Sequence, residues 1–286
     1  MNTLRVVAVV GCLVGSAAAQ LVTTDAGVIS PELPTVWERL EQFVRDDSRE
    51  LRATTRLAWA PDRRFQVDVV VPFVARTWHV GARATQEGLG DLAIEAKWAL
   101  VRDDDVMRSD RLSLLGGLVL PTGDDEPLVG GHHAGHVATP RSGLGLGTWG
   151  GSLGLGGTLV RDRHRLAAAA RFHALAPDDR FDPGSTATLD LAWWYRVTPA
   201  AFTPDRDDVE VRGVLELLSK WQGDDALAGA GLANGGYDLW MVLGAQVFPS
   251  PAVGLECGVM LPLEMSTESP FGHDRYALTV SFRLAF

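Results

Sequence analysis

Residues 275–286 read RYALTVSFRLAF, and this last stretch of the chain is the clearest indication of the fold. Its even-numbered positions, from Tyr276 to Phe286, are all aromatic or large and aliphatic, whereas the odd-numbered ones are charged, small or hydroxylated. Side chains of a β-strand point alternately to the two faces of a sheet, so a period of two predicts a strand with one apolar and one polar face. In a transmembrane barrel the first set would face lipid and the second a polar lumen.

The same alternation recurs along the chain, and in most copies the face opposite the apolar one carries charge. The further strands predicted in this way cover residues 65–73, 92–100, 187–197, 209–217, 237–247 and 253–263. The charged positions that share the second parity, and that we predict to line the lumen, are Arg52, Arg56, Asp68, Glu95, Lys97, Arg171, Asp190, Arg196, Glu210, Arg212, Glu216, Glu256 and Arg283. Rings of charge bias which solutes pass a water-filled lumen. The same residues could instead pair with one another inside a closed barrel, and the sequence leaves both roles open.

Short and long connections alternate between the predicted strands, as they do in outer-membrane barrels, which have short periplasmic turns and longer outer loops. Short connections lie near residues 61–63, 102–110, 161–163, 198–208 and 249–251, and longer ones near 75–88, 122–142, 176–184, 222–236 and 265–274. Eleven strands follow from Leu51 onward. Because bacterial barrels have an even strand number, a twelfth is expected between Leu21 and Glu50. The predicted fold is all-β, an antiparallel up-and-down transmembrane barrel of about 12 strands, with 10 as the alternative.

Two stretches conflict with a simple succession of strands. Near the N-terminus, Pro34 is placed like an early helix residue, and a short amphipathic helix competes with the twelfth strand. The apolar residues with helical spacing there are Leu33, Val36, Trp37, Leu40, Phe43 and Val44. Further on, the leucines change parity between Leu146 and Leu153, and a bulge near Gly150 would restore the register.

Residues 1–20 have the composition of a removable export signal. Arg5 supplies positive charge, residues 6–15 are apolar, and residues 17–19 are alanines suited to cleavage. We predict cleavage near Ala19 and one barrel domain over residues 21–286. A lipoprotein box ending at Cys12 is the rival interpretation, although the apolar run before it is very short. After cleavage only Cys257 remains, so no internal disulfide can form.

Composition narrows the function. The formal net charge is −10 and the isoelectric point is near 5.1, which argues against nucleic acid as a partner. The 31 glycines favour strands and turns over helices. A soluble periplasmic β-protein that binds lipid stays open as an alternative, but it would have to explain the export signal, the glycines and the terminal aromatic together.

Several short pieces of the chain are similar to one known family. They are Gly88-Leu89-Gly90-Asp91-Leu92 leading into Lys97-Trp98, then Gly117-Leu118-Val119-Leu120-Pro121-Thr122-Gly123, Asn234-Gly235-Gly236, Leu261-Pro262 and the terminal Phe286. In order and separation the chain from about Leu51 onward resembles the outer-membrane transporters of the meta-pathway phenol-degradation family. The resemblance implies a barrel that passes small molecules, hydrophobic ones among the candidates, across the outer membrane. It does not establish phenol as the solute, and the front of the chain, with Asp25 and a helix-like run, departs from the family.

Other motifs give weaker hypotheses. His132, His133 and His136 form a cluster in a long loop that could take a soft metal ion, but the neighbouring glycines provide no fixed scaffold. Residues 145–150 satisfy the pattern G-x-G-x-x-G, yet the residues after them predict a strand rather than the helix that a dinucleotide site needs. Residues 150–154 match the pattern G-x-S-x-G, but the residues after them predict a strand rather than the helix of a nucleophile elbow. We therefore expect neither an enzyme nor a cofactor.

The sequence thus predicts a porin-like barrel of the Gram-negative outer membrane. It would give small molecules a passive route, or a route by binding and release. The expected partners are outer-membrane lipid, the barrel-assembly machinery through the strand ending in Phe286, and an unidentified solute. A closed envelope barrel that conducts nothing is the structural alternative. Most tryptophans fall near predicted strand ends, where aromatic girdles meet lipid headgroups.

Overall fold

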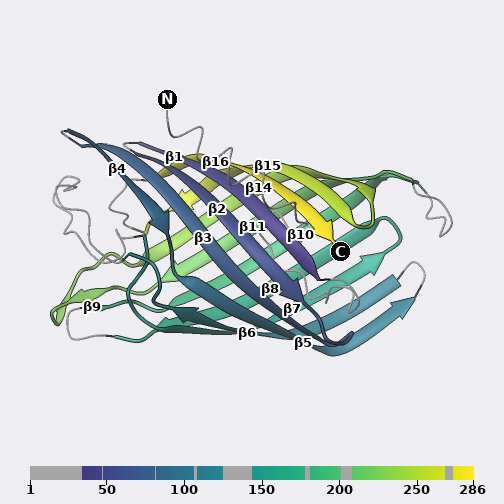
Figure 1. The fold of residues 1–286 in the computed structure, drawn as a ribbon, viewed down its shortest axis with the longest axis horizontal. Coiled ribbons are helices and arrows are strands. Elements are labelled where there is room, and N and C mark those ends of the chain that lie inside the picture. The colour runs from purple at the N-terminus through teal and green to yellow at the C-terminus, as the bar shows by residue number, and fades with distance from the viewer. Residues whose placement is uncertain are drawn as a thin grey trace.

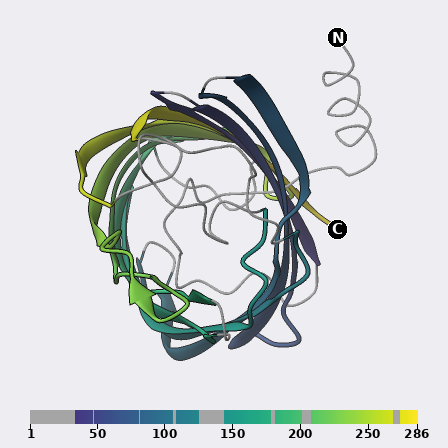
Figure 2. The same cartoon turned by 90° about the vertical axis from the view of Figure 1, so that its left-hand side faces the viewer.

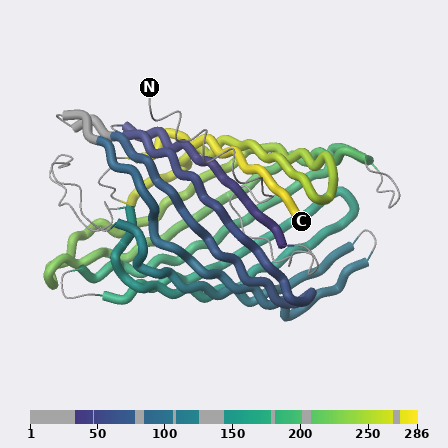
Figure 3. Tube along the Cα trace, viewed as in Figure 1, coloured from purple at the N-terminus to yellow at the C-terminus, as the bar shows by residue number. Residues whose placement is uncertain are grey.

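The structure, a computed structural model, describes residues 34–46, 48–80, 82–105, 108–124, 144–177, 181–200, 208–267 and 273–286. Within these ranges every regular element is a β-strand, and twelve of them close into one antiparallel barrel, as predicted (Figures 1 and 2). Each strand pairs with the next along the chain, and the first pairs with the last. The strands run obliquely to the long axis of the barrel (Figure 3).

The barrel strands are long enough to cross a bilayer when tilted. They are β1 (Thr35–Arg45), β2 (Ser48–Trp59), β3 (Phe65–Val80), β5 (Leu92–Asp105), β6 (Arg108–Leu120), β7 (Gly150–Arg161), β8 (His164–Leu175), β10 (Thr186–Thr198), β11 (Glu210–Gln222), β14 (Gly236–Ser250), β15 (Val253–Met265) and β16 (Asp274–Ala285). A further strand, β4 (Ala82–Leu89), pairs with the far part of β3. Three two-residue strands, β9 (Phe181–Asp182), β12 (Ala226–Leu227) and β13 (Ala230–Gly231), form a small separate sheet.

The predicted twelfth strand is β1, and the competing helix over residues 36–44 is wrong. β1 pairs with β2 on one side and with β16 on the other, and so closes the barrel. Without it, both neighbours would present unpaired backbone groups to the membrane, where no water can satisfy them. Leu40 faces outward while Phe43 is buried inside, so the helical spacing arose from a strand with apolar residues on both faces. Leu33 and the predicted export signal lie outside the described residues.

The two faces of β16 follow the predicted pattern. Leu278, Val280 and Phe282 are 45%, 46% and 41% exposed, whereas the intervening Thr279 and Ser281 are buried inside the barrel. Similar rows of exposed leucine and valine run over the outer face of the other strands. An apolar belt of this extent is costly in water and suits the hydrocarbon core of a membrane. The apolar side therefore faces out and the polar side faces in.

Most aromatic side chains mark the two ends of this belt. Trp59, Trp98 and Phe286 lie exposed toward one end, and Trp149 and Trp221 lie exposed toward the other. Trp221 contacts Tyr237 with ring centroids 4.9 Å apart. Two tryptophans do not belong to this girdle: Trp194 and Trp240 take the inward parity of β10 and β14, and Trp194 is only 3% exposed.

The two ends of the barrel also differ in their connections. The start of β1 and the end of β16 lie together at the end that carries the short turns after β2, β5, β7 and β14, which we call the turn end. The opposite end, the loop end, carries the connections after β3, β6, β8, β11 and β15 and the short β1–β2 connection. The predicted bulge near Gly150 is wrong, because β7 pairs with β6 and β8 without any register shift. The leucine parity changes because β7 begins at Gly150, and residues 144–149 lie outside it.

Candidate functional site

The inner wall of the barrel gathers the charged residues that the sequence singled out. All thirteen predicted lumen residues occupy the positions that alternate with the exposed apolar face of their strands. Their surroundings differ, however. One half of the wall contains ion pairs, and the other contains an apolar stripe next to a row of polar groups, some of whose atoms have no hydrogen-bond partner within the described residues.

The paired half centres on Glu95 of β5. Arg56 donates to Asp68 and lies 3.0 Å from Glu95, while Arg171 of β8 donates to Glu95 from the other side at 3.1 Å. The amide of Gln66 donates to Asp68 at 2.6 Å. We call Arg56, Asp68, Glu95 and Arg171 the charged wall. Because each charge has an opposite charge as a direct neighbour, the set favours a fixed interior lining.

Arg171 reaches Glu95 across two intervening strands, and glycines make this reach possible. Gly117 of β6 pairs with Glu95, and Gly154 of β7 pairs with Arg171. A Cβ on Gly154 would lie 2.3 Å from the carbonyl oxygen of Ala170 and 2.7 Å from Cγ of Arg171. A Cβ on Gly117 would lie 2.7 Å from Oγ of Ser152. The guanidinium stem therefore lies flat over a wall that has no side chains at these points.

A second ion cluster, toward the loop end, was missed from the sequence. Glu50 is 1% exposed and accepts from Arg52 at 2.7 Å, Arg76 at 2.9 Å and Arg45 at 3.1 Å. Arg45 also donates to Asp274 at 2.6 Å. Of these residues, Arg52 alone was predicted from the sequence. Glu50 has the parity of Arg52 on the same strand, and extending the strand pattern by two residues would have found it.

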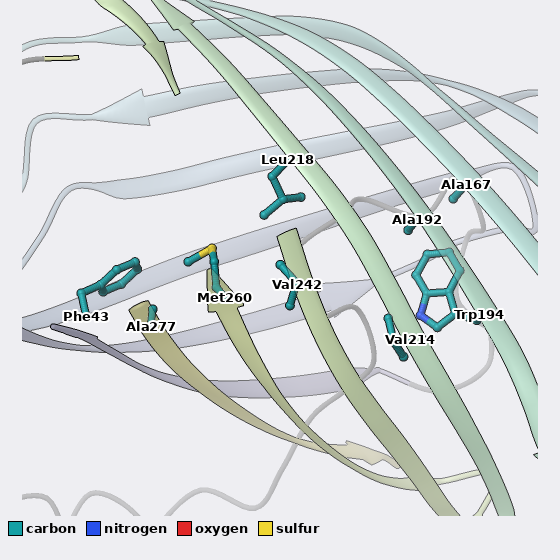
Figure 4. Close-up of a cluster of buried hydrophobic side chains, with 9 residues drawn as sticks. All are labelled: Phe43, Ala167, Ala192, Trp194, Val214, Leu218, Val242, Met260 and Ala277. Atoms are coloured by element: carbon teal, nitrogen blue, oxygen red, sulfur yellow. The ribbon is translucent and has the colours of Figure 1, made fainter. Parts of the chain in front are cut away.

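The other half of the wall carries an apolar stripe that the sequence did not predict. Its members come from β1, β8, β10, β11 and β14–β16, and Figure 4 shows them following one another across the wall. They are Phe43, Ala167, Ala192, Trp194, Val214, Leu218, Val242, Met260 and Ala277, with Trp240 packed against them. All nine are buried, although they face the interior of the barrel. The inner lining therefore has an apolar side as well as a charged one.

A row of polar groups borders this stripe and is incompletely satisfied. Along the register, Arg212 lies opposite Gln246, Gln246 opposite Glu256, Glu256 opposite Ser281, and Ser281 opposite Arg39. We call these five residues the polar row. Among the described residues neither carboxylate oxygen of Glu256, nor Oε1 of Gln246, nor Oγ of Ser281 has a hydrogen-bond partner, although all three side chains are nearly fully buried. Unsatisfied buried groups are rare in folded proteins and mark sites that need an explanation.

The remaining predicted lumen residues have local partners or partial exposure. Arg212 donates two hydrogen bonds to Glu210, at 2.8 and 3.0 Å. Arg196 lies 4.0 Å from Asp162 at the turn end. Lys97 is buried beside the charged wall, Glu216 is fully buried in the apolar stripe, and Asp190 and Arg283 are partly buried on the inner face. No single centre therefore unites all thirteen.

Ion pairs also occupy the tip of the β5–β6 hairpin, which extends past the apolar belt at the turn end. Its outer face carries Asp103, Arg108 and Asp110 in place of leucine. Partial burial raises the pKa of Asp104, but hydrogen bonds from Ser109, Arg111 and Arg102 outweigh this and bring the pKa to about 2. These charges lie in water, where ion pairs contribute little to stability.

Several of the short pieces behind the family resemblance meet at the loop end, where they have a structural role. Asp91 accepts backbone hydrogen bonds from Thr122 at 3.1 Å, Gly123 at 2.9 Å and Leu146 at 2.6 Å. A Cβ on Gly123 or Gly145 would come within 3 Å of neighbouring backbone atoms. Asn234 binds Asp225 through its side chain at 2.8 Å. The residues at these junctions fix the loops, whereas Lys97 and Gly117 of the same pieces lie on the inner wall.

Other candidate sites are limited. The histidines His132, His133 and His136 lie outside the described residues, and the described part of the chain contains no group of three metal-ligating side chains. No helix in that part is long and apolar enough to cross a membrane. Cys257 is a free thiol exposed on the outer face of β15.

Comparison with solved structures supports the barrel fold. The chain is similar to the COG4313 outer membrane channel from Pseudomonas putida F1, with a TM-score of 0.73 and 13% identity, covering 93% of this chain and 100% of that one. It is more distantly similar to LpxR from Salmonella typhimurium (TM-score 0.47, 9% identity, 88% and 100% covered) and to the NanC porin (0.44, 10%, 87% and 98%). No family model and no curated protein sequence matches the chain. At these identities the similarity to the first structure establishes the fold alone.

Proposed function

We propose that this chain is an outer-membrane barrel that gives small molecules with an apolar part a route through its interior. The observation that carries the proposal is the apolar stripe on the inner wall. The lumen of a general porin is polar and filled with water. An inward row that includes Phe43, Val242 and Met260 instead makes one side of the interior apolar, while the outer face contacts lipid.

The location follows from the same physical reasoning. An apolar belt bounded by aromatic side chains needs a membrane, and a closed barrel is the usual β-structure that crosses one. The similar channel from Pseudomonas putida supports an outer-membrane location. We further propose that residues 1–20 direct export and are removed near Ala19, and that the strand ending in Phe286 is read by the barrel-assembly machinery.

A closed structural barrel remains the second candidate, and the charged wall favours it. Arg56, Glu95 and Arg171 pair along the wall, so they are satisfied without any solute. A barrel built only for envelope integrity would need no more than this. It would not need an apolar stripe on the inside, which is why we prefer the transport function.

Uptake of solutes into liposomes distinguishes the transport function from the closed structural barrel. Purified protein is reconstituted, its insertion is verified by heat-dependent gel mobility, and uptake of cyclohexanol is compared with that of a sugar of similar size. We expect uptake to favour the apolar solute. Met260→Gln should reduce this preference by making the stripe polar, and Met260→Leu, which keeps an apolar side chain of similar volume, should retain it. Verified insertion without uptake of either solute would favour the structural barrel.

A further inference from the structure

The polar row gives the proposed route a chemical preference. Glu256 is 1% exposed, yet neither carboxylate oxygen accepts a hydrogen bond within the described residues. Its register neighbour Gln246 lies directly opposite on β14 but forms no hydrogen bond of normal geometry with it. A buried carboxylate in this state costs several kcal/mol unless something donates to it.

Two of the nearby arginines are already paired with other acids. Arg212 donates to Glu210 through two nitrogens, and Arg39 lies 4.0 Å from Glu41. Neither donates a hydrogen bond to Glu256 within the described residues, although both attract its charge. Arg283 of β16 also lies nearby, and its Nε has no hydrogen-bond partner in the same part of the chain. The carboxylate therefore contrasts with Glu50 and Glu95, each of which accepts directly from arginine.

The unsatisfied atoms are mostly acceptors and lie together. Two carboxylate oxygens of Glu256 and Oε1 of Gln246 can only accept, while the hydroxyls of Ser281 and Thr279 can accept or donate. A group that satisfies them must offer several hydrogens, and a positive charge would offset the carboxylate. A primary ammonium group has three donors and one positive charge.

An apolar body can continue from such a head group. The inward position next to Glu256 on β15 is Gly258, which lies opposite Gly244 of β14, so no side chain from these strands separates Glu256 from the stripe residues Val242 and Met260. Met260 lies four residues from Glu256, roughly 13 Å along an extended strand. A ring of five or six carbons attached to the ammonium would span the first part of this distance.

We propose that the polar row is a binding site for the ammonium group of small organic amines whose apolar part lies against Met260 and Val242. The inference rests on the proposed function and narrows its solute to amines. The site would act as a station of binding and release within the barrel. The two lysines of the chain, Lys97 and Lys220, lie on other strands, so β14–β16 themselves supply no ammonium group to Glu256.

Three probes that share one ring test the head group. Cyclohexylamine, cyclohexanol and cyclohexanecarboxylate are titrated into the full mature protein in detergent at neutral pH, where the amine is an ammonium ion. Calorimetry should show that the amine binds at least about tenfold more tightly than the alcohol, the size of one charge-assisted hydrogen bond. The carboxylate should bind most weakly. Equal binding of all three, or preference for the carboxylate, would overturn the proposal.

Two variants assign the preference to the polar row. Glu256→Gln should lose the roughly tenfold advantage of the amine over cyclohexanol. Glu264→Gln removes the same charge from an exposed position on the same strand and should retain the advantage. Should Glu256→Gln fail to fold, the double variant of Gln246→Leu and Ser281→Ala takes its place, with an expected loss of about threefold or more. An advantage that survives these changes would refute the assignment.

A lipid head group could carry the same ammonium. Short-chain phosphatidylethanolamine is therefore added as a competitor, and binding of this lipid without binding of cyclohexylamine would count against a solute site. The outcomes also separate the two proposals. Liposome uptake of cyclohexanol without any amine preference would refute only the amine site, whereas amine binding without uptake of any probe would refute only the transport function.

Discussion

The charged wall and the polar row are built from the same residue types on the same face of one sheet, but they satisfy their charges differently. In the charged wall, Gly117 and Gly154 have no side chains that would block Arg171, so its guanidinium group reaches Glu95. In the polar row, Glu256 is flanked across the strands by Gln246 and Ser281, and Arg212 donates to Glu210 instead. A charged side chain that points inward is thus structural when the wall brings it an opposite charge. It is available to a ligand when the wall does not.

The largest effect is expected from Glu95→Gln, which removes the shared acid of the charged wall. Arg56 keeps Asp68, but Arg171 loses the carboxylate at 3.1 Å. Breaking a partly buried ion pair should lower the free energy of unfolding by about 2–4 kcal/mol. Urea titration of folded protein in lipid vesicles, followed by tryptophan fluorescence, measures it. Asp46→Asn is the control, because its pair with Arg275 is exposed and should contribute under about 1 kcal/mol. Equal losses for the two variants would contradict the distinction.

Gly154→Ala tests how the charged wall is assembled. The new Cβ would meet the backbone of Ala170 at 2.3 Å and the stem of Arg171 at 2.7 Å, so strand spacing or the ion pair must give way. We expect a loss of about 1–3 kcal/mol by the same urea titration. Gly213→Ala is the matched control, because a Cβ at this position has nothing within 4 Å. This variant should leave the free energy of unfolding unchanged or raise it slightly. An unchanged free energy of unfolding for Gly154→Ala would show that the pairing of Arg171 does not depend on the absence of a side chain at this position.

Glu256→Gln should change the free energy of unfolding in the opposite direction from Glu95→Gln. It replaces a buried carboxylate that has no hydrogen-bond partner among the described residues by a neutral group of the same shape. In the absence of ligand we expect the free energy of unfolding to rise by about 1 kcal/mol. Glu256→Asp keeps the charge and should give no such gain. A loss of stability on Glu256→Gln would mean that the polar row is already satisfied and is not a ligand site.

Asp104→Asn should have the smallest effect on the free energy of unfolding, because Asp104 and its arginine partners lie in water at the tip of the β5–β6 hairpin. Hydrogen bonds hold the pKa of Asp104 at about 2, below the usual 3.8, so its stabilisation is present above pH 4 and is lost as the pH falls toward 2. Wild type and variant should differ by a few tenths of a kcal/mol at pH 6 and converge near pH 2. A difference that grows on acidification would contradict the assignment.

Strand order, strand direction and the two faces of the wall could be predicted because they depend on local alternation. The pattern from Tyr276 to Phe286 and its repeats indicated which residues point outward, and the even strand number of barrels required a strand before Leu51. The helix over residues 36–44 and the bulge at Gly150 were wrong for a related reason. Apolar residues on both faces of β1 imitate a helix, and the parity change near Gly150 marks where a strand begins.

The order of the amino acids already implied that apolar and charged side chains lie on opposite faces of a closed sheet. This follows because side-chain direction in a strand depends only on position along the chain. Which inward charges meet was settled by the folded barrel. Arg171 and Glu95 are 76 positions apart in the chain and depend on glycines between their strands. Neither arginine of the polar row, in contrast, donates a hydrogen bond to Glu256 within the described residues. Pairing across a barrel follows from register and curvature, which no local pattern encodes.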